Sequence, residues 1–335
     1  GLSGTFAGPN AASNVLLNAT LNYDANDAWL DVVQVSVTAV QGAVYTPASY
    51  GAAQRVQNAF GQINTALSTA QASGSAPNIS GNFIAAAASL QQAPDVASVQ
   101  NSLQTLSGQL HAASAQMTLD AIDAGTSALS DRFDQLLSAP LTRLALGGWS
   151  QNLGYQGNMG RSGYGGVDYS MNGWMAGADQ PLGSEGVFGY AVSQTRGYGQ
   201  LDASADRNYS HAIEGMVYGG MIRGSWYTMG RFGFGNYVGN MHRYVQLGAA
   251  AIGLSSDSNG RYGVAYSESG YRLGVGEWQV TPYTNLQYVN IRQDGFQEEG
   301  AGGFGLQAGV QNSARWQAGA GLRASRSWRL DSGTA

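Results

Sequence analysis

The side chains of this chain that could do chemistry are few and scattered. The chain has three histidines, His111, His211 and His242, and no cysteine. No two histidines stand at metal-ligand spacing, so the sequence predicts neither a metal site nor thiol catalysis. It contains no G-x-S-x-G motif, which marks the nucleophile of many hydrolases. We therefore expect no catalytic centre and no cofactor in these residues, and we interpret the histidines as a helix-surface, a strand and a loop residue, respectively.

One glycine-rich stretch matches a dinucleotide-binding pattern. Residues 300–305 read GAGGFG, which fits G-x-G-x-x-G. That motif works between a strand and a helix whose N-terminus receives the phosphates. Here it falls between two expected strands with no helix after it, so the sequence favours a loop.

An acidic run marks a long predicted helix over residues 106–140. The polar residues of this helix include Gln116, Asp120, Asp123, Ser127, Asp131 and Asp134. We interpret the helix as polar on nearly all sides, ending at Pro140. Such a helix cannot face lipid and buries poorly in an apolar core. Roughly 30 helical residues span about 45 Å, the thickness of a bilayer with its headgroups.

Composition excludes several classes of protein. Only 11% of the 335 residues are charged, the net charge is -5, and glycine reaches 49 residues. An acidic chain of this kind does not favour a nucleic-acid partner. No apolar run is long enough for a transmembrane helix. Residues 1–30 lack the pattern of a signal peptide, so we expect an exported protein to appear here as a mature or truncated piece.

From residue 141 onward the sequence changes to a period of two. In residues 278–291, WQVTPYTNLQYVNI, apolar and polar side chains alternate, with Trp278, Leu286 and Tyr288 on the apolar side. Residues 314–328 repeat this pattern. Alternation with aromatic residues near the strand ends is typical of a transmembrane β-barrel. About eight strands are expected, joined by alternating short and long links. One of the long links is expected between the strands at 225–242 and 257–273.

The preceding helix fits the wet lumen of such a barrel. We expect its aspartates to contact lumen side chains and seat the helix, because charges in a confined lumen are less screened than charges on an open surface. The expected lumen partners are Arg231, Glu268, Arg315 and Arg323. The alternative is that the aspartates are simply solvated in a water-filled pore.

Two further regions precede this helix. Residues 48–105 are expected to be helical, with Val56, Phe60, Ile63 and Leu67 forming one apolar stripe. Residues 1–45 are expected to form strands around the turn sequence DAND. Apolar residues of this region are expected to share one surface, namely Leu21, Tyr23, Trp29, Val33 and Val35.

Several of these stretches resemble the C-terminal part of type V autotransporters, most closely those with subtilisin-like serine protease passengers. The matching pieces are LNYDANDAWLDVV at 21–33, LSGQLHAAS at 106–114, GGWSQ at 147–151 and PYTNLQY at 282–288. The resemblance implies an all-β transmembrane antiparallel β-barrel with an α-helix in its lumen. The family barrel has twelve strands, so about four strands are expected to be missing here.

The resemblance also divides the chain. Residues 1–45 would be the end of a β-helical passenger, residues 46–104 an extracellular helical connector, residues 105–140 a pore-threading helix and residues 141–335 an outer-membrane translocator barrel. The passenger end would include Tyr23, Asp24, Asn26, Asp27 and Trp29. The helix lacks the Asn–Asn pair at which one branch of the family cleaves itself, so cleavage inside the barrel is not expected.

The function implied is secretion and surface anchoring of an N-terminal passenger. The implied partners are outer-membrane lipid and lipopolysaccharide, the barrel-assembly machinery, periplasmic chaperones and the passenger itself. The alternative is an outer-membrane channel or porin-like protein with a helix-constricted pore. A third hypothesis is that the complete protein is an enzyme such as a surface protease, whose catalysis would lie outside these residues.

Overall fold

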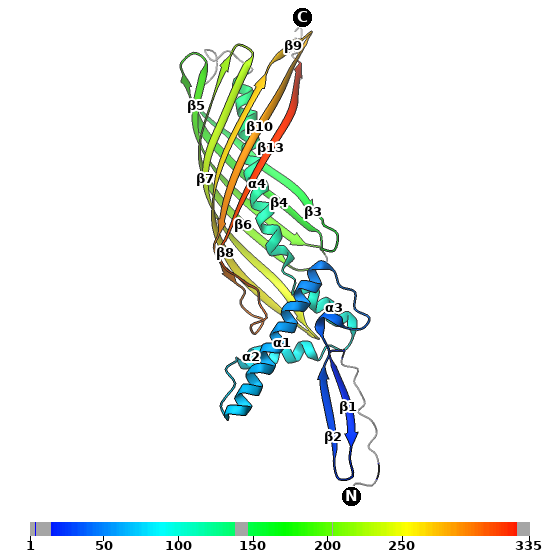
Figure 1. Cartoon of the computed structure of the whole chain (residues 1–335). Helices are drawn as coiled ribbons and strands as arrows, with labels where there is room; N and C mark the ends of the chain where they lie inside the picture. Colours follow the sequence, from blue (N-terminus) through cyan, green and yellow to red (C-terminus); the bar gives the residue numbers. More distant parts are fainter. Residues whose placement is uncertain (1–3, 5–14, 138–146, 203, 327–335) are drawn as a thin grey trace, which may run out of the picture.

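The structure is a computed structural model that describes residues 4, 15–137, 147–202 and 204–326. A long, curved antiparallel sheet runs through most of it, and one long helix lies along the concave side of that sheet (Figure 1). A small helical region and a separate hairpin sit at the end where this helix begins. None of the helices in the described ranges combines the length and apolar content that a membrane-spanning helix needs.

Eight long strands follow one another in the sheet in chain order, each antiparallel to the next, as the sequence predicts. They are β3 (Gly148–Met159), β4 (Val167–Leu182), β5 (Gly186–Leu201), β6 (Arg207–Arg223), β7 (Trp226–Leu247), β8 (Ala250–Tyr271), β10 (Trp278–Gln293) and β13 (Gln311–Arg326). Short β9 (Leu273–Val275) pairs with β10, and β11 (Phe296–Gln297) pairs with β12 (Gln307–Ala308). Among the described residues nothing pairs with the outer edges of β3 and β13, so the sheet is an open half-barrel. The predicted continuation to Trp328 lies outside the described residues.

The predicted alternation of faces holds along the strands. On β10, Thr281 and Gln287 are buried on the concave side, while Leu286 and Trp278 are about half exposed on the convex side. On β7, Phe232 and Phe234 point outward with 62% and 76% of their surface exposed, whereas Arg231, next to Phe232, is fully buried. The convex face is therefore the apolar one.

The expected long link between β7 and β8 is wrong. The two strands stay paired as far as Leu247 and Ala250, and only two residues make the turn. His242 accordingly lies on β7 and not in a loop. The alternation continues through this stretch, because Met241, Val245 and Leu247 are buried on the inner side. Some polar residues that suggested a loop, such as His242 and Asp257, are outward members of two long strands, whereas Arg243 and Ser256 are buried on the inner side.

Glycine and tyrosine form cross-strand pairs on the inner face. A Cβ at Gly235 would overlap the ring of Tyr262, which lies directly opposite on β8, and Gly260 stands in the same relation to Tyr237 on β7. Six such pairs occur among the described residues: Gly157–Tyr169, Gly189–Tyr218, Gly235–Tyr262, Gly260–Tyr237, Gly270–Tyr227 and Gly321–Tyr283. Each ring covers the bare backbone of the facing glycine, which removes that backbone from water and fixes the ring's direction.

The helical region consists of α1 (Pro47–Ser73), α2 (Gly81–Gln91) and α3 (Val96–Thr105), with the short 3-10 helix η1 (Val37–Ala39) before them. Thr46 and Ser49 form a capping box at the start of α1, and Gly74 ends it in the left-handed conformation. The predicted stripe is buried at Val56, Phe60 and Ile63. Leu67, one turn further on, is 42% exposed because α1 extends past its partners there.

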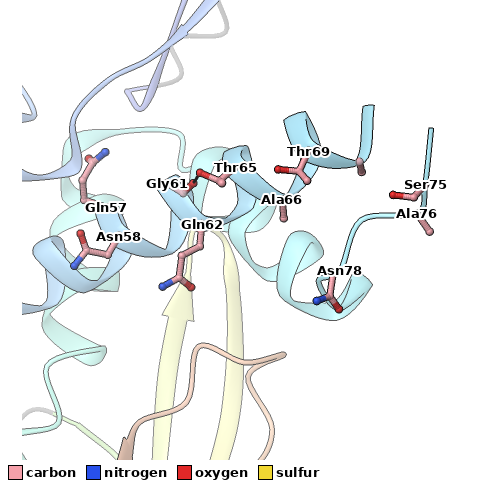
Figure 2. Close-up of a pocket in the computed structure, with 11 residues that line it drawn as sticks. Gln57, Asn58, Gly61, Gln62, Thr65, Ala66, Thr69, Ser75, Ala76 and Asn78 are labelled. Carbon is pink, nitrogen blue, oxygen red and sulfur yellow. Dashed lines mark hydrogen bonds between the residues drawn. The ribbon is translucent and has the colours of Figure 1, made fainter. Parts of the chain in front are cut away.

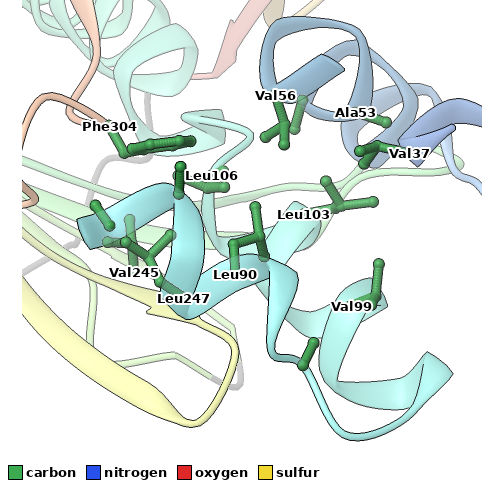
Figure 3. Close-up of a cluster of buried hydrophobic side chains, with 14 of the residues drawn as sticks. Val37, Ala53, Val56, Leu90, Val99, Leu103, Leu106, Val245, Leu247 and Phe304 are labelled. Carbon is green, nitrogen blue, oxygen red and sulfur yellow. The ribbon is translucent and has the colours of Figure 1, made fainter. Parts of the chain in front are cut away.

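These helices share one apolar core with the tip of the β7–β8 hairpin (Figure 3). Leu90 of α2 and Leu103 of α3 are fully buried near Leu247 at that tip. Phe304, from the loop between β10 and β13, closes the same cluster. The core therefore joins the helical region directly to the sheet.

At the N-terminal side, β1 (Leu17–Tyr23) and β2 (Ala28–Gln34) form a hairpin. Asp24 makes the turn, because its carboxylate accepts hydrogen bonds from the amides of Asn26 and Asp27. These two hydrogen bonds lower the pKa of Asp24. The expected single apolar surface is wrong: Trp29 faces Asn22 in the register, on the side opposite to Leu21. Tyr23 faces Ala28 on the same side as Leu21.

Candidate functional site

The long helix α4 (Gln109–Leu137) runs along the inner face of the half-barrel, in contact with β3, β4, β5 and β6 (Figure 1). It starts after Gly108, whose φ of 73° breaks the chain away from α3. Its start is therefore three residues later than the sequence predicts. The predicted end at Pro140 lies outside the described residues.

The helix is not polar on nearly all sides, which corrects the sequence interpretation. Ile122, Leu129, Phe133 and Leu136 are buried, each with at most 3% of its surface exposed. They pack on methionine and tyrosine side chains of the sheet, including Met175, Met229 and Tyr237. The inner wall is thus part apolar and part hydroxylic. It accepts a helix whose apolar residues alternate with polar ones.

Arg315 of β13 reaches the helix directly. Its guanidinium lies 2.5 Å from a carboxylate oxygen of Asp123. The side-chain amide of Gln287 on β10 donates to the same oxygen at 2.6 Å, and the hydroxyl of Thr126 donates to Oε1 of Gln287 at 3.0 Å. One aspartate of the helix is therefore held by two neighbouring strands.

A second cluster lies further along the helix. Arg323 contacts Asp134 at 3.0 Å and Glu268 on β8 at 2.7 Å. The hydroxyls of Tyr227 and Tyr266 also donate to Glu268, at 2.8 and 2.6 Å. Only 1% of the Glu268 side chain is exposed. A buried carboxylate is tolerable here because three donors surround it.

Arg231 contacts the helix differently from the expectation. It is fully buried and pairs with Glu214 of the neighbouring strand at 3.3 Å, not with an aspartate of α4. It also donates to the backbone carbonyl of Ile122 at 3.3 Å and to the Sδ of Met216 at 3.5 Å. Gly125 lies beside this contact, and a Cβ there would be in ordinary van der Waals contact with the guanidinium, at 3.6 Å.

The other predicted helix residues divide into two groups. The side chain of Gln116 donates to Asp120 at 2.8 Å, and the hydroxyl of Tyr169 on β4 donates to Asp120 at 2.5 Å. Ser127 and Asp131 are exposed instead, because they point to the open side of the half-barrel.

A further ion pair, which was not predicted from the sequence, lies near the C-terminal part of the helix. Arg132 of α4 lies 2.5 Å from Asp179 of β4. Trp149 and Tyr218 donate to the other oxygen of Asp179. The alternation along β4 places Asp179 on the inner face. A lone charged residue at an inward position of this strand was the sequence signal that could have predicted a buried ion pair.

A buried charge cluster at the start of the helix was also missed. Arg243 of β7 lies 2.5 Å from Glu298 in the β10–β13 loop and 3.5 Å from Asp206. It also donates to the carbonyl oxygen of Thr105. The Nε2 of His111 lies 2.7 Å from Glu298, and its ring stacks on Phe296. These contacts join α3, α4, β7 and two loops in one place.

Two carboxyl groups of this cluster, those of Glu298 and Asp206, have shifted pKa values. Burial would raise the pKa of Glu298, but the hydrogen bond with His111, the charge of Arg243 and the amide of Leu306 together lower it to about 2. Burial raises the pKa of Asp206, against the amide of Tyr244 and the charge of Arg243. Glu298 is therefore the carboxylate that this cluster stabilises in its charged form.

Gly300, Gly302 and Gly303 adopt positive φ values; Gly302 and Gly303 lie close to α2, and Gly300 lies close to Gly253 of β8. A Cβ at Gly302 would come within 2.7 Å of the carbonyl oxygen of Asn82. Among the described residues no helix follows this loop, so the structure gives it a packing role.

A polar hollow of about 760 Å³ lies between α1 and the loop that comes after it (Figure 2). Amide, hydroxyl and small side chains such as Gln57, Gln62, Thr65 and Asn78 line it, without an ionisable group. In the described part of the chain, no three His, Asp or Glu side chains are placed to hold a metal ion.

A family model described as Autotransporter beta-domain matches residues 148–335, more than half of the chain. The chain belongs to the autotransporter β-domain family. Two extracellular serine proteases of Serratia marcescens are 29% and 28% identical to this autotransporter chain over 247 and 245 residues. Each alignment covers 70% of this chain and 23% of the relative, so the chain spans about a quarter of their length.

The structure is similar to the translocator domain of autotransporter NalP from Neisseria meningitidis, with a TM-score of 0.51. The match has 17% identity and covers 62% of this chain and 72% of that one, which shows the fold. The autotransporter chain thus carries a translocator domain, an outer-membrane fold linked to a passenger and not an enzyme fold. Nothing in these findings favours the porin alternative.

Proposed function

We propose that α4 fills the lumen of the translocator after the passenger has crossed and ties the passenger to the barrel. The main support for this proposal is that α4 makes side-chain ion pairs with two separate strands of the sheet. Asp123 and Asp134 pair with β13, and Arg132 pairs with β4. Pairs spaced along a helix fix its depth as well as its rotation, because a shift of one turn would separate all of them.

We place the start of α4 and everything before it at the cell surface. The turns at Gly183, Gly224 and Gly276 lie at the opposite end of the sheet from the helical connector, whereas the connector end carries the longer β3–β4 and β10–β13 links beside the two-residue β7–β8 turn. Outer-membrane barrels have their short turns on the periplasmic side. Residues 15–45 are then the surface-exposed end of the passenger, including Tyr23, Asp24, Asn26, Asp27 and Trp29.

We expect biogenesis to involve the barrel-assembly machinery and periplasmic chaperones, as in other members of the family. Any protease activity of the complete protein would belong to its passenger. The β1–β2 hairpin exposes Leu30, Val32 and Val33. Leu30 and Val32 lie on one side of the hairpin and Val33 lies on the other, and these exposed apolar side chains support its assignment as one end of a larger β-structure.

The test is to delete residues 116–136 from the full-length protein and measure single-channel conductance in planar bilayers. An unplugged barrel should conduct more. Deleting residues 74–79, in the loop after α1, is the control and should leave the conductance unchanged. Equal conductance of the wild type and the plug deletion would contradict the proposal.

A labelling experiment covers the case in which the deletion variant does not assemble. Residues 1–335 contain no cysteine, so labelling above the wild-type level reports the introduced cysteine. On intact cells, a membrane-impermeant maleimide should label Ser68→Cys, which is exposed on α1. It should not label Ser130→Cys, because Ser130 faces the sheet and only 7% of its surface is exposed. Labelling of Ser130→Cys alone would place the helix outside the lumen or reverse the orientation.

A further inference from the structure

Two arginines stand directly opposite each other on the outer face of the sheet. Arg261 of β8 and Arg292 of β10 are partners in the register, and both side chains point outward and are exposed. Like charges in directly opposite positions destabilise a sheet unless an anion lies between them. The side chain of Arg261 makes no hydrogen bond or ion pair with another described residue. Arg292 has one loose ion pair, 3.9 Å from Asp294.

A hollow opens beside this arginine pair. Its volume is about 640 Å³, and its outward lining includes Phe232, Phe234, Ala265 and Tyr288 as well as both arginines. Its floor is formed by Gly263 on β8, which has no side chain to fill the space between the rings. Asn236, Asn290 and Asn312 flank the arginines. The site therefore has an apolar half and a cationic half.

The position of the site in the membrane matches a lipid of the outer leaflet. Trp226 begins β7 near the periplasmic end, and Asn236, the β7 partner of Arg261, is ten residues further along. Ten residues of a tilted strand rise about 25 Å, which is the height of the apolar band of such barrels. This depth rests on the proposed orientation, with the helical connector at the cell surface. The aromatic half then lies at acyl-chain depth and the arginines lie at headgroup depth.

We propose that this hollow is a binding site for a phosphorylated lipid of the outer leaflet. The two guanidiniums bind the headgroup phosphate by charge-assisted hydrogen bonds, with the flanking asparagines as further donors. One acyl chain lies on Gly263 between the phenylalanine and tyrosine rings. The lipid thereby neutralises the opposed arginines and anchors β8 and β10 at a fixed depth.

The test uses the full-length protein in a neutral alkyl maltoside, titrated with lipid A and read by native mass spectrometry. The wild type should retain one lipid A, and the double variant Arg261→Gln/Arg292→Gln should bind it at least about tenfold more weakly, since two charge-assisted hydrogen bonds to the phosphate are lost. Gly263→Leu should weaken binding to a similar degree although both arginines remain. Its Cβ would sit in ordinary contact, 3.4 Å from the Phe234 ring, so the strand should tolerate it.

Matched controls separate this site from a general cationic belt. Arg196 is another exposed, outward arginine, on β5, but its neighbours in the register are Asn172 and His211. Gly154 on β3 is outward, and nothing lies within 4 Å of the position that a Cβ would take there. Arg196→Gln and Gly154→Leu should bind lipid A as the wild type does. Equal losses in the controls, or no loss in the site variants, would overturn the proposal.

Two further probes identify the source of the anion. Inorganic phosphate at millimolar concentration should not compete with lipid A, because it cannot use the apolar half; full competition would make this a simple anion site. Phosphatidylglycerol should bind more weakly than lipid A, and the reverse preference would overturn the assignment to the outer leaflet. Bilayer conductance of the same variants should equal that of the wild type, so failure of the lipid site and failure of the plug are distinguishable.

Discussion

At the scale of single residues, the buried carboxylate Glu268 depends on Arg323. Replacing Arg323 by Met leaves Glu268 with only two tyrosine donors and should destabilise the folded barrel by about 3 kcal/mol, the typical cost of breaking a buried pair. The heat-induced mobility shift on polyacrylamide gels measures this loss. The control is Arg326→Met, whose partner Glu277 is 71% exposed, and whose loss should be below about 1 kcal/mol. Similar losses in the two variants would show that Glu268 does not need its cation.

Glu298 gives the start of α4 a predictable response to acid. Its pKa in the folded protein is about 2, below the ordinary 4.5, so its stabilising effect is complete above 4.5 and is lost as the pH falls from 4.5 towards 2. Asp206 has a raised pKa and acts in the opposite direction, because protonation relieves its burial. Opening of α3, measured by hydrogen exchange and corrected for the intrinsic pH dependence of exchange, should therefore become easier between about pH 5 and pH 3 in the wild type. In Glu298→Gln the opening should be easy at both pH values, and a parallel pH dependence in this variant would argue against Glu298 as its source.

Among the strands, the glycine–tyrosine pairs should contribute to the stability of the inner wall, which can be tested by substitution. Gly235→Ala would push the Tyr262 ring off its place over the facing strand, which we expect to cost about 1–3 kcal/mol as in other overpacked cores. Gly215→Ala on the outer face meets nothing within 4 Å and should be neutral or slightly stabilising. Chemical denaturation in detergent micelles, followed by tryptophan fluorescence, compares the two. Equal stability of both variants would mean that the rings do not depend on the glycines.

The strands and the helix differ in how far the sequence predicts them. A period of two is set by the backbone, so eight strands and the inward position of Thr281 or Gln287 follow from the alternation alone. The faces of α4 could not be assigned in the same way, because its partner is neither apolar nor aqueous. Phe133 packs on Gly220, and Asp120 accepts a hydrogen bond from the hydroxyl of Tyr169. Both polar and apolar residues of the helix therefore face the sheet. The partner of Arg231 could not be predicted either. Whether it pairs with Glu214 or with an aspartate of α4 depends on distances between side chains, which the spacing of residues in the sequence does not give.

At the scale of the whole molecule, the helical connector and the half-barrel form one body. Leu247 and Val245 at the tip of the β7–β8 hairpin are buried with Leu90 and Leu103 of the connector. Gly248 in the tip donates its amide hydrogen to Ser102 and leaves no room for a Cβ beside the carbonyl oxygen of Ser89. A passenger attached to this connector would therefore emerge in a fixed direction, not from a flexible tether.

Gly248→Val should separate the connector from the barrel. The added side chain would collide with the backbone of α2, so the connector should undock and the loop between α1 and α2 should become sensitive to protease on intact cells. Gly276→Val is the control, because Gly276 has nearly the same φ, 60° against 62°, but nothing within 4 Å of its Cβ position. Both variants carry the same backbone strain, so faster cleavage in Gly248→Val alone isolates the contact with α2. If the two were cleaved at the same rate, the strain of the turn and not the docking would control access, and the connector would have to be held by the Arg243–Glu298 cluster instead.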